Sequence, residues 1–230
     1  FQKLEELKNH PNWILNLGLG FDAIAQIPIS TEPLRRILIE HPEDAMSLGL
    51  GLRALHKGGL FSQSTRKILI DSPREALQLA KSFVLLNNKA IFTEFNQKTI
   101  IANKLQAKKI LEGIKQLNCL AILNTENFEA IIKQPNEAPH HANSLYHLHR
   151  NGLCSEKNRQ TLTEHSEFAV NISEALETLS NKEKLTQEIL ELILQFPQYA
   201  EQITGFINST HELCTDRLEI LKLMCQSSLI

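Results

Sequence analysis

The 230-residue sequence has few aromatic residues, little net charge and no long apolar run. None of its apolar stretches reaches the roughly 18 residues that a membrane-spanning helix needs, so we expect no membrane span. Aromatic residues make up 6% of the chain and the formal net charge is −2, which argues against nucleic acid as the partner. With 42% hydrophobic and 22% charged residues, the composition is that of a globular protein.

Sequence motifs of enzymes and metal sites are also missing. The cysteines Cys119, Cys154, Cys214 and Cys225 show no CxxC spacing, so we expect reduced thiols, a cytosolic setting and neither disulfides nor zinc. The sequence holds no nucleophile elbow, no P-loop, no HExxH and no GxGxxG after a strand. We therefore expect no catalytic residues, no cofactor and no enzymatic activity in this chain.

The densest group of possible metal ligands is a run of histidines with one cysteine among them: His140, His141, His147, His149, His165 and Cys154. Two of them, His140 and His147, share a helix face but lie about 10 Å apart along the axis. His147 and His149 point in nearly opposite directions. His141 falls at an apolar position of the pattern described below, so the spacing favours a core residue over a metal ligand.

One unit recurs along the chain with a 31-residue period. Residues 10–20, HPNWILNLGLG, match residues 41–51, HPEDAMSLGLG, and the same phase continues toward the C-terminus. The positions that anchor the successive units are Pro11, Pro42, Pro73, Lys104, Pro135, Ser166 and Pro197. Three residues later, Ile14 is followed by a column of alanines: Ala45, Ala76, Ala107, Ala138, Ala169 and Ala200.

The residues after each anchor have the spacing of one helix face. Three apolar columns begin at Leu17, Phe21 and Ile24 and recur once in every unit, with His141 in the first column and Thr210 ending the third. A column of small residues runs beside them, which predicts close helix crossings: Gly20, Gly51, Ser82, Gly113, Ser144 and Ala175, interrupted by Phe206. We name the helix that carries these columns helix B.

A second helix in each unit, helix A, is predicted by a helix-capping residue at a fixed phase. These capping residues are Thr31, Ser62, Thr93, Asn124, Ser155 and Thr186. Seven residues after each cap comes a fully apolar column: Leu7, Leu38, Leu69, Ile100, Ile131, Leu162, Ile193 and Met224.

These patterns predict an all-α fold, an α-solenoid of about seven helix-turn-helix units that forms a single repeat domain over residues 1–230. Helix A is expected to span about nine residues and helix B about fourteen, with proline in the first turn of helix B. We expect the last unit to be irregular, because Lys184, Phe206 and Thr210 break the pattern and residues 213–215 are shifted. Because the chain starts at Phe1 inside a helix A, we also expect it to be a segment of a longer protein.

Residues 52–76, LRALHKGGLFSQSTRKILIDSPREA, resemble a repeat of secreted effectors from Legionella and related intracellular bacteria. Residues 145–169, LYHLHRNGLCSEKNRQTLTEHSEFA, follow the same pattern. The resemblance implies a protein-binding module of a translocated effector that acts in the host cell's cytosol. A more distant resemblance is to tetratricopeptide repeats, although these have a longer unit and aromatic signature positions that this chain lacks.

The charges are separated along the chain. Residues 1–115 carry 16 Lys and Arg against 11 Asp and Glu, whereas residues 116–230 carry 8 against 15. On helix A, stacking would align the basic residues Arg35, Arg36, Arg66, Lys67 and Lys98, and the sign reverses at Glu129, Gln160 and Glu191. We expect this basic row to be the partner-binding site, because clustered charge steers association.

Three functions follow from these observations. The first is a non-catalytic scaffold that binds or regulates another protein. The second is the structural arm of a multidomain enzyme whose catalytic part lies elsewhere. The third is a helical repeat that binds RNA; the basic row favours it, and the acidic C-terminal half opposes it.

Overall fold

The computed structural model describes residues 6–29, 31–209 and 215–227, and every regular element in these ranges is a helix. The described residues form fourteen α-helices and five short 3₁₀ helices, and successive helices pack against their neighbours in sequence. The chain divides into two compact units, residues 1–111 and 112–230, with the boundary inside α8. Residues Thr210 and Cys214, which the sequence analysis singled out, lie outside the described ranges.

In unit 1, helices of the B type alternate with helices of the A type. The B helices are α2 (Pro11–Ala25), α4 (Ala45–Lys57) and α6 (Ala76–Asn88), and α8 (Ala107–Cys119) begins here. The A helices are α3 (Glu32–Glu40), α5 (Gln63–Ile70) and α7 (Glu94–Ala102). Two 3₁₀ helices, Leu7–Asn9 and Lys104–Gln106, complete the unit.

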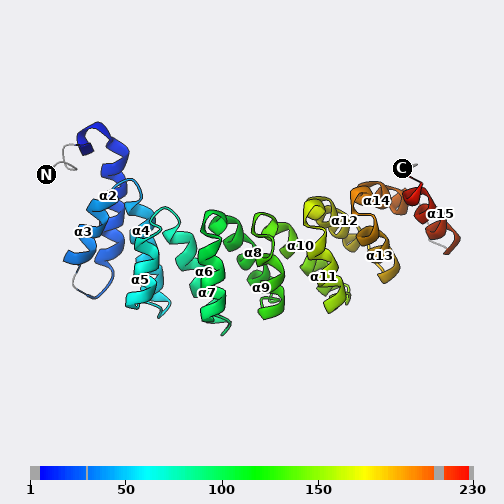
Figure 1. The fold of residues 1–230 in the computed structure, drawn as a ribbon, viewed down its shortest axis with the longest axis horizontal. Coiled ribbons are helices and arrows are strands. Elements are labelled where there is room, and N and C mark those ends of the chain that lie inside the picture. Colours follow the sequence, from blue (N-terminus) through cyan, green and yellow to red (C-terminus); the bar gives the residue numbers. More distant parts are fainter. Residues whose placement is uncertain (1–5, 30, 210–214, 228–230) are drawn as a thin grey trace. The chain divides into compact units, whose positions relative to one another are not determined.

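Unit 2 continues the alternation. Its B helices are α10 (Ala138–Arg150), α12 (Ala169–Asn181) and α14 (Ala200–Ser209). Its A helices are α9 (Thr125–Ile132), α11 (Glu156–Glu164), α13 (Gln187–Gln195) and α15 (Thr215–Gln226), and 3₁₀ helices span Pro135–Glu137, Ser166–Phe168 and Pro197–Tyr199. Within this unit α9, α11 and α13 lie along one side and α10, α12 and α14 along the other (Figure 1).

The alanine column marks where helix B begins. Each B helix from α4 to α14 starts at an alanine, and these alanines all share one phase of the 31-residue period. They are at most 1% exposed, whereas Ile14, which replaces alanine in the first unit, is 55% exposed. The column of helix A is buried from Leu38 to Ile193. Most predicted core positions are therefore confirmed in both units, but Leu7, Phe21 and Met224, near the two ends of the chain, are only half-buried.

In most units the proline of the repeat does not lie in the first turn of helix B, where we expected it. Only α2 carries its proline, Pro11, in the first turn of the α-helix. In later units the anchor position instead opens a three-residue turn or 3₁₀ helix, and the α-helix starts at the alanine after it. Proline suits either place because it has no amide to satisfy.

Close helix crossings occur where the small column predicts them. A Cβ added at Gly51 would lie 2.7 Å from the carbonyl oxygen of Ala76, and one at Gly113 would lie 2.9 Å from that of Ala138. Gly20 meets Ala45 in the same way, at 2.5 Å. The small residue of one helix B thus lies against the first turn of the next helix B.

Five of the six predicted caps form. Ser62, Thr93, Asn124, Ser155 and Thr186 have extended backbones, and each side-chain oxygen accepts a hydrogen bond from the amide three residues on. The prediction is wrong at Thr31, which has helical backbone angles and makes no side-chain cap.

The loop before helix A turns at a residue in the left-handed region. This residue is Gly59, Ala90, Ala121, Gly152 or Glu183, with φ between 57° and 70°. The next amide donates to a carbonyl five residues back, as in Leu60 to Leu55 at 2.9 Å, which is the hydrogen bond of a Schellman motif. Pro28 occupies the equivalent position in the first unit. Its ring restricts φ to negative values, so this corner cannot form before Thr31.

Three of these corners carry a side chain where glycine is preferred. We expect Ala90→Gly, Ala121→Gly and Glu183→Gly each to raise the free energy of unfolding by about 1 kcal/mol, because a left-handed residue with a Cβ is strained. Urea titrations followed by circular dichroism measure the change. The control is Gly59→Ala, where an added Cβ meets nothing within 4 Å and only the backbone cost remains. A neutral Gly59→Ala would contradict this explanation.

Candidate interaction surface

The predicted basic row lies on three consecutive A helices of unit 1. Arg35 and Arg36 on α3, Lys67 on α5 and Lys98 on α7 are exposed, and Arg66 on α5 is half-buried. Arg36, Lys67 and Lys98 share one phase of the 31-residue period, and Arg35 and Arg66 share the neighbouring phase. The row thus consists of two adjacent lines of cations.

Two of these cations form ion pairs with glutamates on their own helices. Arg36 pairs with Glu32 at 3.3 Å and Lys98 pairs with Glu94 at 2.6 Å, each one helical turn away along the exposed face. The hydrogen bond from Lys98 lowers the pKa of the Glu94 carboxyl below its usual value. Exposed pairs of this kind contribute little stability and exchange partners readily. The paired cations thus remain able to contact an acidic partner.

Arg66 is the one half-buried cation of the row, and it makes two contacts with its surroundings. Its guanidinium carbon lies 5.1 Å from the centre of the Phe61 ring. Its Nε donates to the carbonyl oxygen of Ser62 at 3.3 Å. The guanidinium is therefore fixed beside the loop that precedes α5.

In unit 2 the same phase carries acidic or neutral side chains on α9, α11 and α13, and a cation, Lys222, on α15. Glu129 on α9, Gln160 on α11 and Glu191 on α13 are all exposed. Gln160 donates to Glu156 at 2.9 Å, and Gln187 donates to Glu191 at 2.9 Å. The reversal of charge that the sequence predicts is thus present on the exposed face of unit 2.

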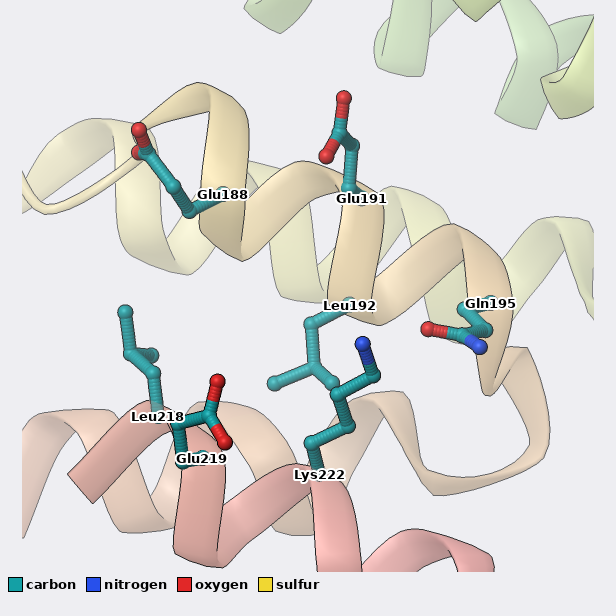
Figure 2. Close-up of a pocket in the computed structure, with 7 residues that line it drawn as sticks. All are labelled: Glu188, Glu191, Leu192, Gln195, Leu218, Glu219 and Lys222. Carbon is teal, nitrogen blue, oxygen red and sulfur yellow. The ribbon is translucent and has the colours of Figure 1, made fainter. Parts of the chain in front are cut away.

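Two grooves separate neighbouring A helices in unit 2. One, of about 150 Å³, lies between α9 and α11, and its lining includes Glu126 and Glu129. The other, of about 260 Å³, lies between α13 and α15 and includes Glu188 and Glu191 at positions two periods further on. Figure 2 shows Leu192 of α13 pointing toward α15, on the side that carries Glu219 and Lys222, whereas the carboxylates of Glu188 and Glu191 point away from α15. Both grooves are lined mainly by charged side chains.

The histidines of the run lie on α10 and in the turn that follows α11. Within the described ranges no group of three or more His, Cys, Asp or Glu side chains could hold a metal ion. His141 is fully buried, as predicted for a core residue, and burial lowers its pKa from 6.5 to about 4. Neither of its ring nitrogens has a hydrogen-bond partner among the described residues.

Cys154 is a half-buried thiol whose surroundings favour the protonated form. Burial raises the pKa of its thiol, although Arg159 lies 3.8 Å from the sulfur. The Arg159 guanidinium is itself paired with Glu156 at 2.7 Å. Cys119, Cys154 and Cys225 are free thiols in the structure.

No protein-family model, curated protein or solved structure matches this chain. None of the described helices is both long enough and apolar enough to cross a membrane.

A set of buried polar residues was not anticipated from the sequence. Asn96, Asn127 and Asn158 lie one helical turn into helix A, and each side-chain amide donates to the carbonyl that follows the left-handed corner, at 2.7–2.8 Å. Thr65 fills the same role in α5. These side chains join each corner to the helix that carries the charged face. The recurrence of asparagine at 31-residue intervals was the signal for them.

Proposed function

We propose that this chain is a non-catalytic protein-binding scaffold whose partner docks on the exposed face of the A helices. The proposal is supported by a contrast between the buried and the exposed positions of the 31-residue repeat. Apart from His141, the buried core phases stay apolar or small from one period to the next, whereas one exposed phase changes charge: Arg36, Lys67, Lys98, Glu129, Gln160, Glu191 and Lys222. A surface that varies on a constant frame is suited to recognising a specific partner.

We infer that the two units are parts of one α-solenoid of about seven 31-residue repeats. The alternation of A and B helices and the recurring helix starts support this inference. A continuous stack would align the cations of α3, α5 and α7 along one surface. It would also give the partner a contact area longer than any single helix offers.

The resemblance of residues 52–76 and 145–169 to effector repeats supports a more specific proposal. We propose that the chain is a module of a bacterial secreted effector that binds or regulates another protein in the host cytosol. The charge of the chain indicates the kind of partner: a protein with an acidic docking surface suits the basic row of unit 1.

Reversing four charges of the row is expected to abolish capture of the partner. The variant Arg35→Glu, Arg36→Glu, Arg66→Glu and Lys67→Glu should lower recovery of a specific partner at least tenfold, because steering and contact both depend on these cations. The measurement is a quantitative pull-down from host-cell lysate, followed by the association rate of the purified partner at two salt concentrations.

The matched control reverses four charges of unit 2: Glu126→Lys, Glu129→Lys, Glu188→Lys and Glu191→Lys. It should retain the partner, and both variants should keep the wild-type circular dichroism spectrum. A partner bound equally by both variants, with an unchanged salt dependence, would contradict the proposal. Salt-sensitive binding of single-stranded RNA with no protein partner would favour the RNA-binding alternative instead.

A further inference from the structure

We propose that a groove at the start of α5 and α7 binds an extended acidic peptide that inserts one large apolar side chain between Phe61 and Phe92. This inference rests on the proposed function, since it identifies the chemistry of the partner. The groove has a volume of about 320 Å³, near the lower end of the ~300–1,000 Å³ typical of ligand pockets. Its lining residues are Gly59, Leu60, Phe61, Ser62, Ser64, Thr65, Phe92 and Gln97.

Each of the two aromatic rings contacts a second ring of the protein. The Phe92 ring packs on the buried ring of Phe83, with their centres 5.2 Å apart. The Phe61 ring makes an edge-to-face contact with the His56 ring, and their centres lie 5.9 Å apart. Both phenylalanines are half-buried, so each keeps some surface exposed for an incoming apolar side chain. Rigid aromatic surfaces bind at a low entropic cost.

The aromatic lining is specific to this part of the chain. At the equivalent phase in later units the residues are Leu123, Cys154 and Leu185. Two of them, Leu123 and Leu185, are buried rather than half-buried. Phe61 and Phe92 are thus not required by the packing of the unit, since leucine fills the same position elsewhere.

Polar groups at the groove suit a peptide backbone and an acidic side chain. The half-buried Gln97 carboxamide makes no side-chain hydrogen bond to any described residue, so it can pair with a peptide group. The Arg66 guanidinium lies beside the groove through its contact with Phe61, and among the described residues it hydrogen-bonds only through Nε. Its remaining N–H groups suit a carboxylate.

The charge of unit 1 determines which peptide fits. Residues 1–111 carry 15 Lys and Arg against 10 Asp and Glu, so a basic or strongly cationic segment would be repelled. An apolar residue that fills a pocket, surrounded by complementary charges, is the usual arrangement of a peptide anchor. The acidic unit 2 of a second copy is the other occupant to be tested.

The test is fluorescence anisotropy of the intact 230-residue chain with a labelled probe peptide, EEGEWEGEE. We expect saturable binding with a dissociation constant of about 10–100 µM and a clear loss of affinity in high salt. A peptide with alanine in place of the tryptophan should bind at least tenfold more weakly, and the lysine counterpart KKGKWKGKK should not bind.

Two variants test the groove itself. Gln97→Glu places a negative charge in the groove, and Phe61→Leu with Phe92→Leu removes the rings while keeping the residue type that Leu123 shows to be compatible with the fold. Each should weaken the probe at least tenfold. Gln202→Glu, on the exposed surface of α14, makes the same charge change elsewhere and should leave binding unchanged.

Equal binding to wild type and to both groove variants would overturn the inference, as would binding that does not depend on the tryptophan. Sedimentation that shows self-association abolished by Gln97→Glu would also overturn it, because the occupant would then be a second copy. A partner that needs Arg35 and Arg36 but not the groove leaves the proposed function intact. If the probe binds in the groove but no protein partner depends on the basic row, the proposed function is contradicted and the inference about the groove stands.

Discussion

Replacement of His141 by leucine is expected to raise the free energy of unfolding by about 2–3 kcal/mol, because each buried polar group that stays unpaired costs about 1–3 kcal/mol. His141 is fully buried in α10, and neither ring nitrogen has a hydrogen-bond partner among the described residues. Leucine or isoleucine occupies every other position of this column, from Leu17 to Ile203, so a leucine of similar volume fits the frame. A urea titration measures the gain.

The neighbouring His140 provides the matched control. It is half-exposed, so His140→Leu removes a histidine from the same helix without relieving a buried polar group. We expect it to change the free energy of unfolding by no more than about 0.5 kcal/mol. If both variants gained equally, the stabilisation would come from added apolar surface and not from burial of an unpaired ring.

The same residue predicts a loss of stability in acid. The folded pKa of His141 is about 4 and its ordinary value is 6.5, so between these values the unfolded chain binds a proton that the folded chain does not. The free energy of unfolding should therefore fall by about 3 kcal/mol as the pH falls from 6.5 to 4. Burial also lowers the pKa of His147 and His149, so His141→Leu should reduce this slope and not remove it.

Gly51→Ala should destabilise the protein although alanine is the better helix former. The new Cβ would lie 2.7 Å from the carbonyl oxygen and 2.8 Å from the carbonyl carbon of Ala76. Both atoms belong to the backbone of α6, so α4 and α6 would have to separate. We expect the free energy of unfolding to fall by about 2 kcal/mol, the usual size of an overpacking effect. The midpoint of thermal or urea unfolding reports the change.

Gly18→Ala is the matched control in the same unit. Gly18 is exposed inside α2, and a Cβ there meets nothing within 4 Å. The substitution should therefore stabilise by about 0.5–1 kcal/mol through helix propensity alone. Opposite signs at Gly51 and Gly18 would support close crossing as the reason for glycine in the small column. Equal effects would contradict it.

Much of the fold could be predicted because the period separates core positions from exposed ones. Once residues 10–20 and 41–51 are aligned, the alanine column and the apolar columns follow from it, and the structure buries nearly all of them. The caps follow from residue type, since a side-chain oxygen before an apolar face suits a helix start.

Features that depend on a single dihedral angle or a side-chain contact could not be predicted. Thr31 has the right residue type for a cap, but Pro28 prevents the left-handed corner that positions the caps of later units. Ala90, Ala121 and Glu183 adopt the left-handed region against their intrinsic preference, because the surrounding packing fixes the corner.

The candidate site was predicted as a row of charges but not as a surface with a groove. The phase of Arg36, Lys67 and Lys98 can be derived from the period, and their exposure follows. The contact between Arg66 and Phe61 depends on the path of the loop before α5. Sequence spacing does not define that path, so the groove beside Phe61 and Phe92 emerged only from the structure.

Hydrogen–deuterium exchange of the chain, alone and with its captured partner, tests the central claim most directly. If the partner docks on the A helices of unit 1, peptides that cover α3, α5 and α7 should gain protection. Peptides that cover α4 and α6 should not. Protection confined to α4 and α6, or no change in any A helix despite saturating partner, would contradict the claim.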